Sequence, residues 1–189
     1  MTQRAVRLAG SLPPIFGSYR PDLFRAEDAA RAAIGGADSR PFWVSFTLTD
    51  AEPEAVAEGR RAPTVRSGES IAEAARAALD LHAQALLFNC SHASVMEAAI
   101  REATAAFVGL PIENRPAIGV YTNAFAHHSH SDEGAANKGL SDLRDDLGPQ
   151  EYLAFARHWR DAGASIIGGC CGIGPEYIAG LVAALRKNG

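Results

Sequence analysis

Short apolar runs alternate with helical patterns along most of the chain. Each run is a cluster of hydrophobic residues of the kind found in a buried strand. The segments between them place apolar residues at helical spacing, as in SIAEAARAALDLHAQ. The runs are Ala5–Ala9, Phe42–Leu48, Ala85–Phe88, Ala117–Tyr121 and Ala164–Ile167. This alternation predicts an α/β fold with a parallel sheet and right-handed helical crossovers, as a single domain over residues 1–189.

Two of the predicted helices begin at a capping box, a serine followed three residues later by a glutamate. Ser70 with Glu73 and Ser94 with Glu97 match this pattern. In a capping box each side chain accepts a hydrogen bond from the backbone N–H of the other residue, so both helices have a well-defined start.

Prolines and glycines mark further helix ends. Proline suits the first helical turn, and glycine suits the position just after the last turn. The residues that mark starts are Pro149 and Pro175, and those that mark ends are Gly163 and Gly189. Two long stretches, Ser11–Phe24 and Thr122–Gly148, show no regular pattern and are predicted to be loops that are either functional or mobile.

Composition indicates a globular domain with small-molecule partners. The 189 residues are 47% hydrophobic and 21% charged, which is enough apolar material for a core. A net charge of −4 provides no basic field for nucleic acid. No apolar run approaches the roughly 20 residues of a membrane span, and the start MTQRAVRLAG lacks the pattern of a signal peptide. We therefore expect a cytoplasmic protein with reduced thiols and with no nucleic-acid or membrane partner.

The three cysteines stand at equivalent places in this predicted fold. Cys90 follows the strand Ala85–Phe88, whereas Cys170 and Cys171 follow the strand Ala164–Ile167. Because the carboxyl ends of parallel strands lie at one edge of a sheet, all three thiols are expected at that edge. Three sulfur ligands favour zinc and leave a fourth tetrahedral position open, which is typical of catalytic zinc.

Other interpretations of these features are open. A buried cysteine such as Cys90 is commonly a small hydrophobic residue of a core. Adjacent cysteines such as Cys170 and Cys171 can form a strained disulfide, although a reducing compartment disfavours it. A second feature that could bind metal is the histidine-rich run of His127, His128 and His130. A polar loop of that kind is more commonly solvated.

The sequences around the cysteines resemble the motifs of the homocysteine S-methyltransferase family. FNC, VYTNAF and GGCCGIGPEYI correspond to the family's NC, YPN and GGCC motifs, with Thr122 where proline is commoner. LAGSLPPIFGSYRPDLF also resembles the segment after the family's third strand, and PFWVSFTL resembles its fifth strand, so the similarity covers most of the chain. The resemblance implies a (β/α)₈ barrel, a TIM barrel, in which Cys90, Cys170 and Cys171 bind Zn²⁺.

The resemblance also implies a reaction. Enzymes of the family transfer a methyl group from a sulfonium compound or from betaine to the thiolate of homocysteine, which gives methionine. The implied partners are therefore homocysteine and a small methyl donor, and no catalytic residue beyond the zinc site is implied. Asn89, Tyr121 and Asn123 flank the expected site and are candidates for substrate binding. Tyr19 and Phe125, like Tyr121, are candidates to rest against an onium donor, although such aromatic residues more commonly pack within the fold.

Parts of the family's pattern are missing from this sequence. Nothing corresponds to the first strand with its Asp-Gly-Gly motif or to the second strand. The fourth strand, with the Glu-Thr pair that contacts homocysteine, is absent at the junction of Phe24 and Arg25. About five of eight strands are recognisable, whereas a complete barrel usually needs about 250 residues. Either the natural chain has lost these parts, or the sequence omits a segment between residues 24 and 25. The second alternative is favoured, because so short a barrel would expose the edges of its parallel sheet and apolar surface.

The missing motifs leave three functions open. The first is zinc-dependent methyl transfer, and the second is a non-catalytic zinc-binding remnant or subunit of the family. The third is a metal-free thiol or redox protein with a disulfide between Cys170 and Cys171. Metal analysis separates the third from the others, and a methyl-transfer assay separates the first two. An exposed edge of the sheet also predicts self-association into a homo-oligomer.

Overall fold

The computed structural model describes residues 15–18, 42–126 and 143–185. These residues contain a five-stranded sheet in the order β1-β2-β3-β4-β5, in which every pair of neighbours is parallel. The strands are β1 (Ile15–Ser18), β2 (Trp43–Thr47), β3 (Ala85–Asn89), β4 (Ala117–Thr122) and β5 (Ile166–Gly169). The helices are α2 (Pro53–Ala57), α3 (Ile71–Asp80), α4 (Ala93–Ala106), α5 (Pro149–Ala162) and α6 (Pro175–Leu185), with a 3₁₀ turn at Ile112–Asn114.

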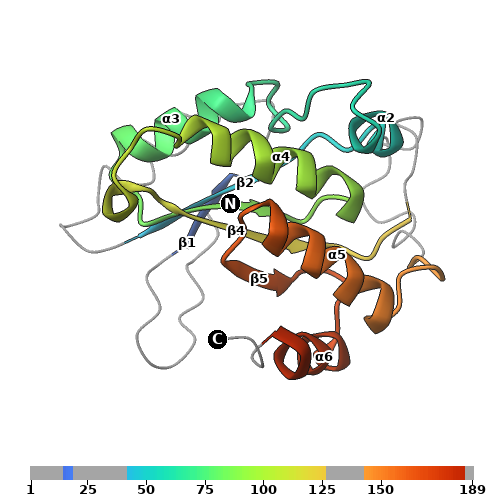
Figure 1. Cartoon of the computed structure of the whole chain (residues 1–189). Coiled ribbons are helices and arrows are strands. Elements are labelled where there is room, and N and C mark those ends of the chain that lie inside the picture. Colours follow the sequence, from blue (N-terminus) through green and yellow to red (C-terminus); the bar gives the residue numbers. More distant parts are fainter. Residues whose placement is uncertain (1–14, 19–41, 127–142, 186–189) are drawn as a thin grey trace.

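The helices follow one another in the same order as the strands. Helix α4 packs between α3 and α5, and α6 packs beside α5 (Figure 1). A doubly wound sheet would reverse its strand order at a switch point, whereas a barrel keeps the order of the sequence and carries its helices outside. The described sheet is therefore an arc of a barrel, which confirms the predicted α/β barrel-type fold.

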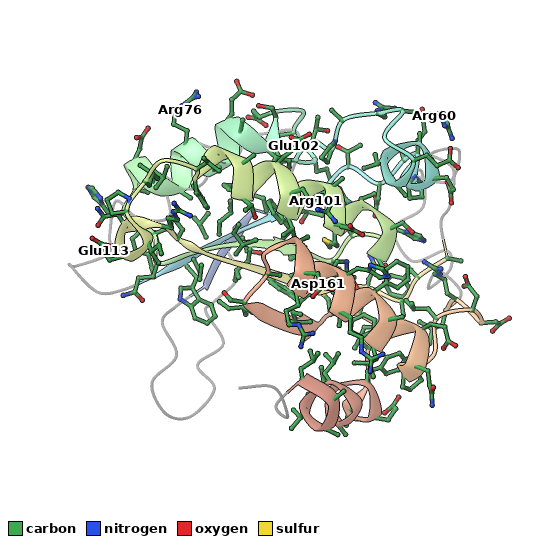
Figure 2. All side chains as sticks on the ribbon, viewed as in Figure 1. Arg60, Arg76, Arg101, Glu102, Glu113 and Asp161 are labelled. Atoms are coloured by element: carbon green, nitrogen blue, oxygen red, sulfur yellow. The ribbon has the colours of Figure 1, made fainter. Side chains whose placement is uncertain are left out.

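The two faces of the sheet have different chemistry. Alternate residues of the strands, such as Phe46, Phe88 and Val120, join the apolar core beneath the helices. The residues between them lie on the opposite face, which is the interior side of the barrel arc, and here Ser45 and Asn89 are buried polar residues. Among the charged residues labelled in Figure 2, Arg76 on α3, Arg101 on α4 and Asp161 on α5 are exposed.

Four of the predicted strands are confirmed, with small shifts at their ends. Strands β3 and β4 each run one residue further than predicted, to Asn89 and Thr122, and β5 runs two residues further, to Gly169. The prediction that Ser11–Phe24 is irregular throughout was wrong, because Ile15–Ser18 forms β1 and pairs with β2 from Trp43 onward. This four-residue strand between prolines and polar residues has too little local pattern to be seen, and its pairing is non-local.

The predicted helix ends are mostly confirmed. Pro149 and Pro175 open α5 and α6, and Gly163 ends α5 with a φ of 122°. The prediction of a capping box at Ser94 was wrong, because α4 begins one residue earlier at Ala93. His92 is its N-cap, and the Nδ1 atom of His92 accepts the backbone N–H of Ser94 at 3.3 Å. An imidazole nitrogen here takes the role usually played by a short side-chain oxygen.

Several predictions lie outside the described residues. These are the strand Ala5–Ala9, the helix end at Gly189, the junction of Phe24 and Arg25, the aromatic candidate Tyr19, and the histidines His127, His128 and His130. Of the predicted loop Thr122–Gly148, the described portions lie at its two ends, where Phe125 forms an isolated bridge with Leu143. Among the helices in the described portions of the chain, none is long and apolar enough to cross a membrane.

The capping box at Ser70 is confirmed and supports a prediction for stability. The backbone N–H of Glu73 donates to Ser70 Oγ at 3.2 Å, and the backbone N–H of Ser70 donates to Glu73 Oε2 at 2.9 Å. Ser70→Ala removes one of these bonds and should lower the free energy of unfolding by about 1 kcal/mol, measured by urea denaturation. Ser165→Ala is the control, at an exposed position before β5 where the hydroxyl makes only a long hydrogen bond of 3.5 Å to the carbonyl of Ile118, and it should change the free energy of unfolding by less than about 0.5 kcal/mol. Equal stability of the two variants would show that the cap is dispensable.

Candidate metal centre

Three thiols meet at the carboxyl edge of the sheet. Cys90 directly follows β3, Cys170 and Cys171 directly follow β5, and β4 lies between these two strands. The Sγ atom of Cys171 lies 3.7 Å from that of Cys90 and 3.7 Å from that of Cys170. All three Sγ atoms lie within 4.8 Å of one another, and none is in a disulfide. The sequence thus correctly anticipated that the thiols converge.

The spacing of the sulfurs suits a tetrahedral metal ion. With Zn–S bonds of about 2.3 Å at tetrahedral angles, two sulfur ligands are separated by about 3.8 Å. The two separations of 3.7 Å are close to that value, and the third is no more than 4.8 Å. A set of three soft sulfur donors fits zinc and leaves one coordination position for another ligand.

Cys90 sits on a backbone that is held in an uncommon conformation. Its φ is 47°, in the left-handed region, where residues other than glycine are infrequent. Its N–H donates to the carbonyl of Tyr121 at 2.9 Å, and its carbonyl accepts from Asn123 Nδ2 at 2.8 Å. The loop after β3 is therefore fastened to the end of β4 and the loop that follows it, and these bonds offset the conformational cost.

The loop that carries the cysteine pair is fastened to the same neighbour. The N–H of Cys170 donates to the carbonyl of Thr122 at 2.8 Å, and the carbonyl of Cys171 accepts from the N–H of Ala124 at 2.9 Å. Gly172 has a φ of 76°, and a Cβ there would lie 2.6 Å from Leu143 Cδ2. The left-handed backbone conformation after the cysteine pair therefore favours glycine at this position.

The thiols of Cys170 and Cys171 have raised pKa values in the absence of a cation. Hydrogen bonding with the Cys90 thiol, followed by burial, raises the pKa of Cys170. Burial, followed by the charge of Cys90, raises the pKa of Cys171. Three thiolates so close together repel one another, so a cation is needed for all of them to ionise. Metal binding here must release protons, and it should weaken as the pH falls.

A buried polar network lies beside the thiols on the interior face of the sheet. Asn89 Oδ1 accepts hydrogen bonds from Ser45 Oγ at 3.0 Å and from Thr47 Oγ1 at 3.4 Å. Ser45 Oγ also lies 2.6 Å from the hydroxyl oxygen of Tyr121. Burial is the main cause of the raised pKa of Tyr121, and the neighbouring charges of Cys170 and Cys90 add to it. Tyr121 is therefore a neutral phenol close to the thiols.

The other candidates from the sequence have different surroundings. Asn123 holds loops in place, because its Nδ2 donates to Cys90 and its Oδ1 accepts the N–H of Phe125 at 3.1 Å. Phe125 is half-buried. The structure thus brings Asn89 and Tyr121 together, while Asn123 supports the backbone of Cys90.

Sequence reasoning missed several residues near the thiols. Ser91 is fully buried, and its Oγ accepts the N–H of Leu48 and donates to the carbonyl of Asn89, both at 2.9 Å. The Nε2 atom of His92 lies 2.5 Å from Nη1 of Arg144, although the two residues are far apart in the chain. Arg144 also binds Asp146, whose pKa this hydrogen-bonded pair lowers to about 2. Only the alternation of polar and apolar residues in WVSFT offered a signal, for Ser45 and Thr47.

The profile of the family described as homocysteine S-methyltransferase matches residues 21–185. The chain belongs to the homocysteine S-methyltransferase family. The resemblance found in the cysteine motifs is thereby confirmed at the level of the family, and with it the assignment to a family of methyltransferases.

Individual relatives agree and also show the extent of the match. Homocysteine S-methyltransferase 1 of Arabidopsis thaliana is 30% identical over 148 residues, which are 78% of this chain and 38% of that protein. Homocysteine S-methyltransferase 3 of the same plant is 27% identical over 150 residues, 78% of this chain and 36% of that protein. The chain thus spans well under half the length of these curated relatives.

A solved structure shares the fold. The oxidized form of the homocysteine methyltransferase MmuM from Escherichia coli matches with a TM-score of 0.53 and 23% identity. The match covers 83% of this chain and 40% of that one. The described sheet of this chain therefore corresponds to only part of the fold of that solved structure.

Proposed function

We propose that the protein carrying this sequence is a zinc-dependent methyltransferase that moves a methyl group from a sulfonium or betaine donor to homocysteine and forms methionine. Cys90, Cys170 and Cys171 are the proposed zinc ligands. The observation that carries the proposal is the convergence of three Sγ atoms within 4.8 Å at the carboxyl edge of a parallel sheet. Membership of the homocysteine S-methyltransferase family supports the choice of substrate.

Each part of the site has a role in this proposal. Bound zinc would hold the homocysteine sulfur as a thiolate at neutral pH, where a free thiol with a pKa near 8.5 is mostly protonated. The ties of Cys90 and Cys170 to the end of β4 keep the sulfurs at fixed separations. The thiolate sulfur then attacks the donor's methyl carbon in line, so that a new S–C bond forms while the bond to the departing sulfide or amine breaks. Holding the two substrates in line contributes several kcal/mol to the rate.

The proposal is tested by methionine formation from homocysteine. The reduced, zinc-loaded full-length protein is incubated with S-methylmethionine, S-adenosylmethionine or betaine, and methionine is measured by mass spectrometry. We expect product with at least one donor and a loss of at least about 100-fold in the Cys90→Ser variant, because removal of a ligand removes the metal. The Ser165→Ala variant is the control and should retain activity.

Two results would favour the other functions. A protein that binds zinc but forms no methionine with any donor would be a non-catalytic zinc-binding member of the family, which the partial match to the relatives makes a real alternative. A protein that binds no zinc and contains a disulfide between Cys170 and Cys171 would be a thiol or redox protein. The identity of the methyl donor, a cytoplasmic location and self-association remain predictions.

A further inference from the structure

The polar network on the interior face of the sheet has a fixed direction. Ser45 has one hydroxyl proton, and it is donated to Asn89 Oδ1. The proton between Ser45 and Tyr121 must therefore come from the Tyr121 hydroxyl, which donates to Ser45 Oγ at 2.6 Å. Thr47 supplies a second donor to Asn89 Oδ1. The Tyr121 proton thus points to Ser45 Oγ, and the Ser45 and Thr47 protons point to Asn89 Oδ1.

This direction determines what the network offers to a ligand. With Oδ1 of Asn89 engaged by two hydroxyls, its Nδ2 group is the free end of the side chain, and among the described residues it donates to no protein atom. Nδ2 is also in contact with solvent. In the described part of the chain, the only polar side-chain atom that is fully buried and has no hydrogen-bond partner is the indole nitrogen of Trp159, so Asn89 Nδ2 is not fully buried. Tyr121 Oη has given its proton to Ser45 and keeps a lone pair. The network therefore presents one N–H donor and one oxygen acceptor.

These two groups lie close together and close to the thiols. One hydroxyl, Ser45 Oγ, contacts both the Asn89 and the Tyr121 side chains. Asn89 and Tyr121 are paired residues on neighbouring strands, and Asn89 directly precedes Cys90. Ser45 and Asn89 are 1% and 5% exposed, so their side chains are packed in place before a ligand arrives. Asn89 and Tyr121 are joined through Ser45 Oγ, so one small ligand that carries both an acceptor and a donor can engage both side chains. An α-amino acid, with a carboxylate and an ammonium group on one carbon atom, is such a ligand.

We propose that Asn89 Nδ2 and Tyr121 Oη recognise the carboxylate and the ammonium group of an α-amino acid, with Ser45 as the positioning residue that orients both. This inference rests on the proposed function, since the amino acid is the one carried by homocysteine or by a sulfonium donor such as S-methylmethionine. Where the bound amino acid is that of the methyl donor, the network selects against betaine, which has a carboxylate but no N–H group. Ser45 acts through its two neighbours and does not itself touch the substrate.

The test measures binding of thiols that lack one of the two groups. The reduced, zinc-loaded chain is titrated by calorimetry with L-homocysteine, with 4-mercaptobutyrate, which lacks the ammonium, and with 3-mercaptopropylamine, which lacks the carboxylate. Asn89→Asp keeps an acceptor for Ser45 and Thr47 but replaces the free N–H donor by an oxygen. It should weaken the two carboxylate ligands about tenfold and leave 3-mercaptopropylamine no weaker. Tyr121→Phe should weaken the two ammonium ligands about fivefold and leave 4-mercaptobutyrate unchanged.

Ser45 variants test the positioning role. Ser45→Ala should weaken the binding of L-homocysteine by about fivefold to tenfold, as the Tyr121 and Asn89 changes do. Ser45→Thr keeps the hydroxyl and should restore the affinity. These variants also keep the test decisive if Asn89→Asp fails to fold. A parallel titration with S-methylmethionine identifies which substrate carries the recognised amino acid. Weakened binding of the thiols alone in the variants points to homocysteine, and weakened binding of S-methylmethionine alone points to the donor; either result supports the proposal.

Several outcomes would overturn the inference. Equal weakening of all ligands in the Asn89 and Tyr121 variants would mean that the network is structural only. Equal affinity of the unchanged protein for the three thiols would also defeat it, and methionine formation in the same preparation would show that the proposed function still stands. If no thiol binds and no methionine forms, both the proposed function and this inference fail.

Discussion

Replacement of Cys90, Cys170 or Cys171 by serine is expected to lower the zinc content of the purified protein from one ion per chain to near zero. Loss of a residue that merely supports a ligand commonly weakens metal binding by 10-fold to 100-fold. Loss of one of three protein ligands should exceed that, so the affinity should fall by more than about 100-fold. The measurement is elemental analysis after dialysis against a weak chelator, with the protein reduced throughout.

The control for this experiment is Ser165→Ala, which lies at the amino end of β5 and should keep one zinc per chain. A count of free thiols in each preparation guards against oxidation, which would remove metal without any change of sequence. Unchanged zinc in all three cysteine variants would defeat the assignment of the ligands. Loss in only one variant would restrict the site to that residue and to ligands outside this set.

Trp159→Ala is expected to cause the largest loss of stability among single changes in the core. Trp159 is completely buried in α5. Its ring stacks on Phe155 with centroids 5.8 Å apart and makes a T-shaped contact with Tyr152, with centroids 5.4 Å apart. Truncation to alanine removes these contacts and leaves a cavity, which should lower the free energy of unfolding by about 3–5 kcal/mol in urea denaturation.

The matched control is Trp159→Phe, because the indole nitrogen makes no hydrogen bond in the described structure. Phenylalanine loses no polar interaction there and keeps most of the ring contacts, so the expected loss is about 1 kcal/mol. If phenylalanine proved as destabilising as alanine, the indole N–H would contribute to stability through a hydrogen bond, and burial of the ring alone would not explain the role of Trp159. If alanine cost less than about 1 kcal/mol, α5 would not anchor the core.

The sequence was sufficient for those features that depend on local pattern. Apolar runs located β2 to β5, and the capping box at Ser70 located the start of α3, because both signals lie within a few residues. The convergence of the cysteines followed from one further step. Residues that directly follow parallel strands share an edge of the sheet, whatever the exact register.

Features that depend on contacts between distant residues could not be predicted. Strand β1 exists through its pairing with β2, and the His92 contact with Arg144 joins residues 52 positions apart. Ser45 looked like an ordinary polar position in an alternating strand, and only the register with β3 places its hydroxyl beside Asn89. The role of Asn123 as a support for the backbone of Cys90 depends likewise on the loop geometry.

The most direct test of the central claim, that Cys90, Cys170 and Cys171 hold a zinc ion that receives the homocysteine thiolate, is zinc X-ray absorption spectroscopy with and without homocysteine. We expect three sulfur ligands at about 2.3 Å and one lighter ligand in the free protein, and four sulfur ligands after homocysteine is added. Fewer than three sulfurs in the free protein, or a spectrum that homocysteine leaves unchanged, would contradict the account.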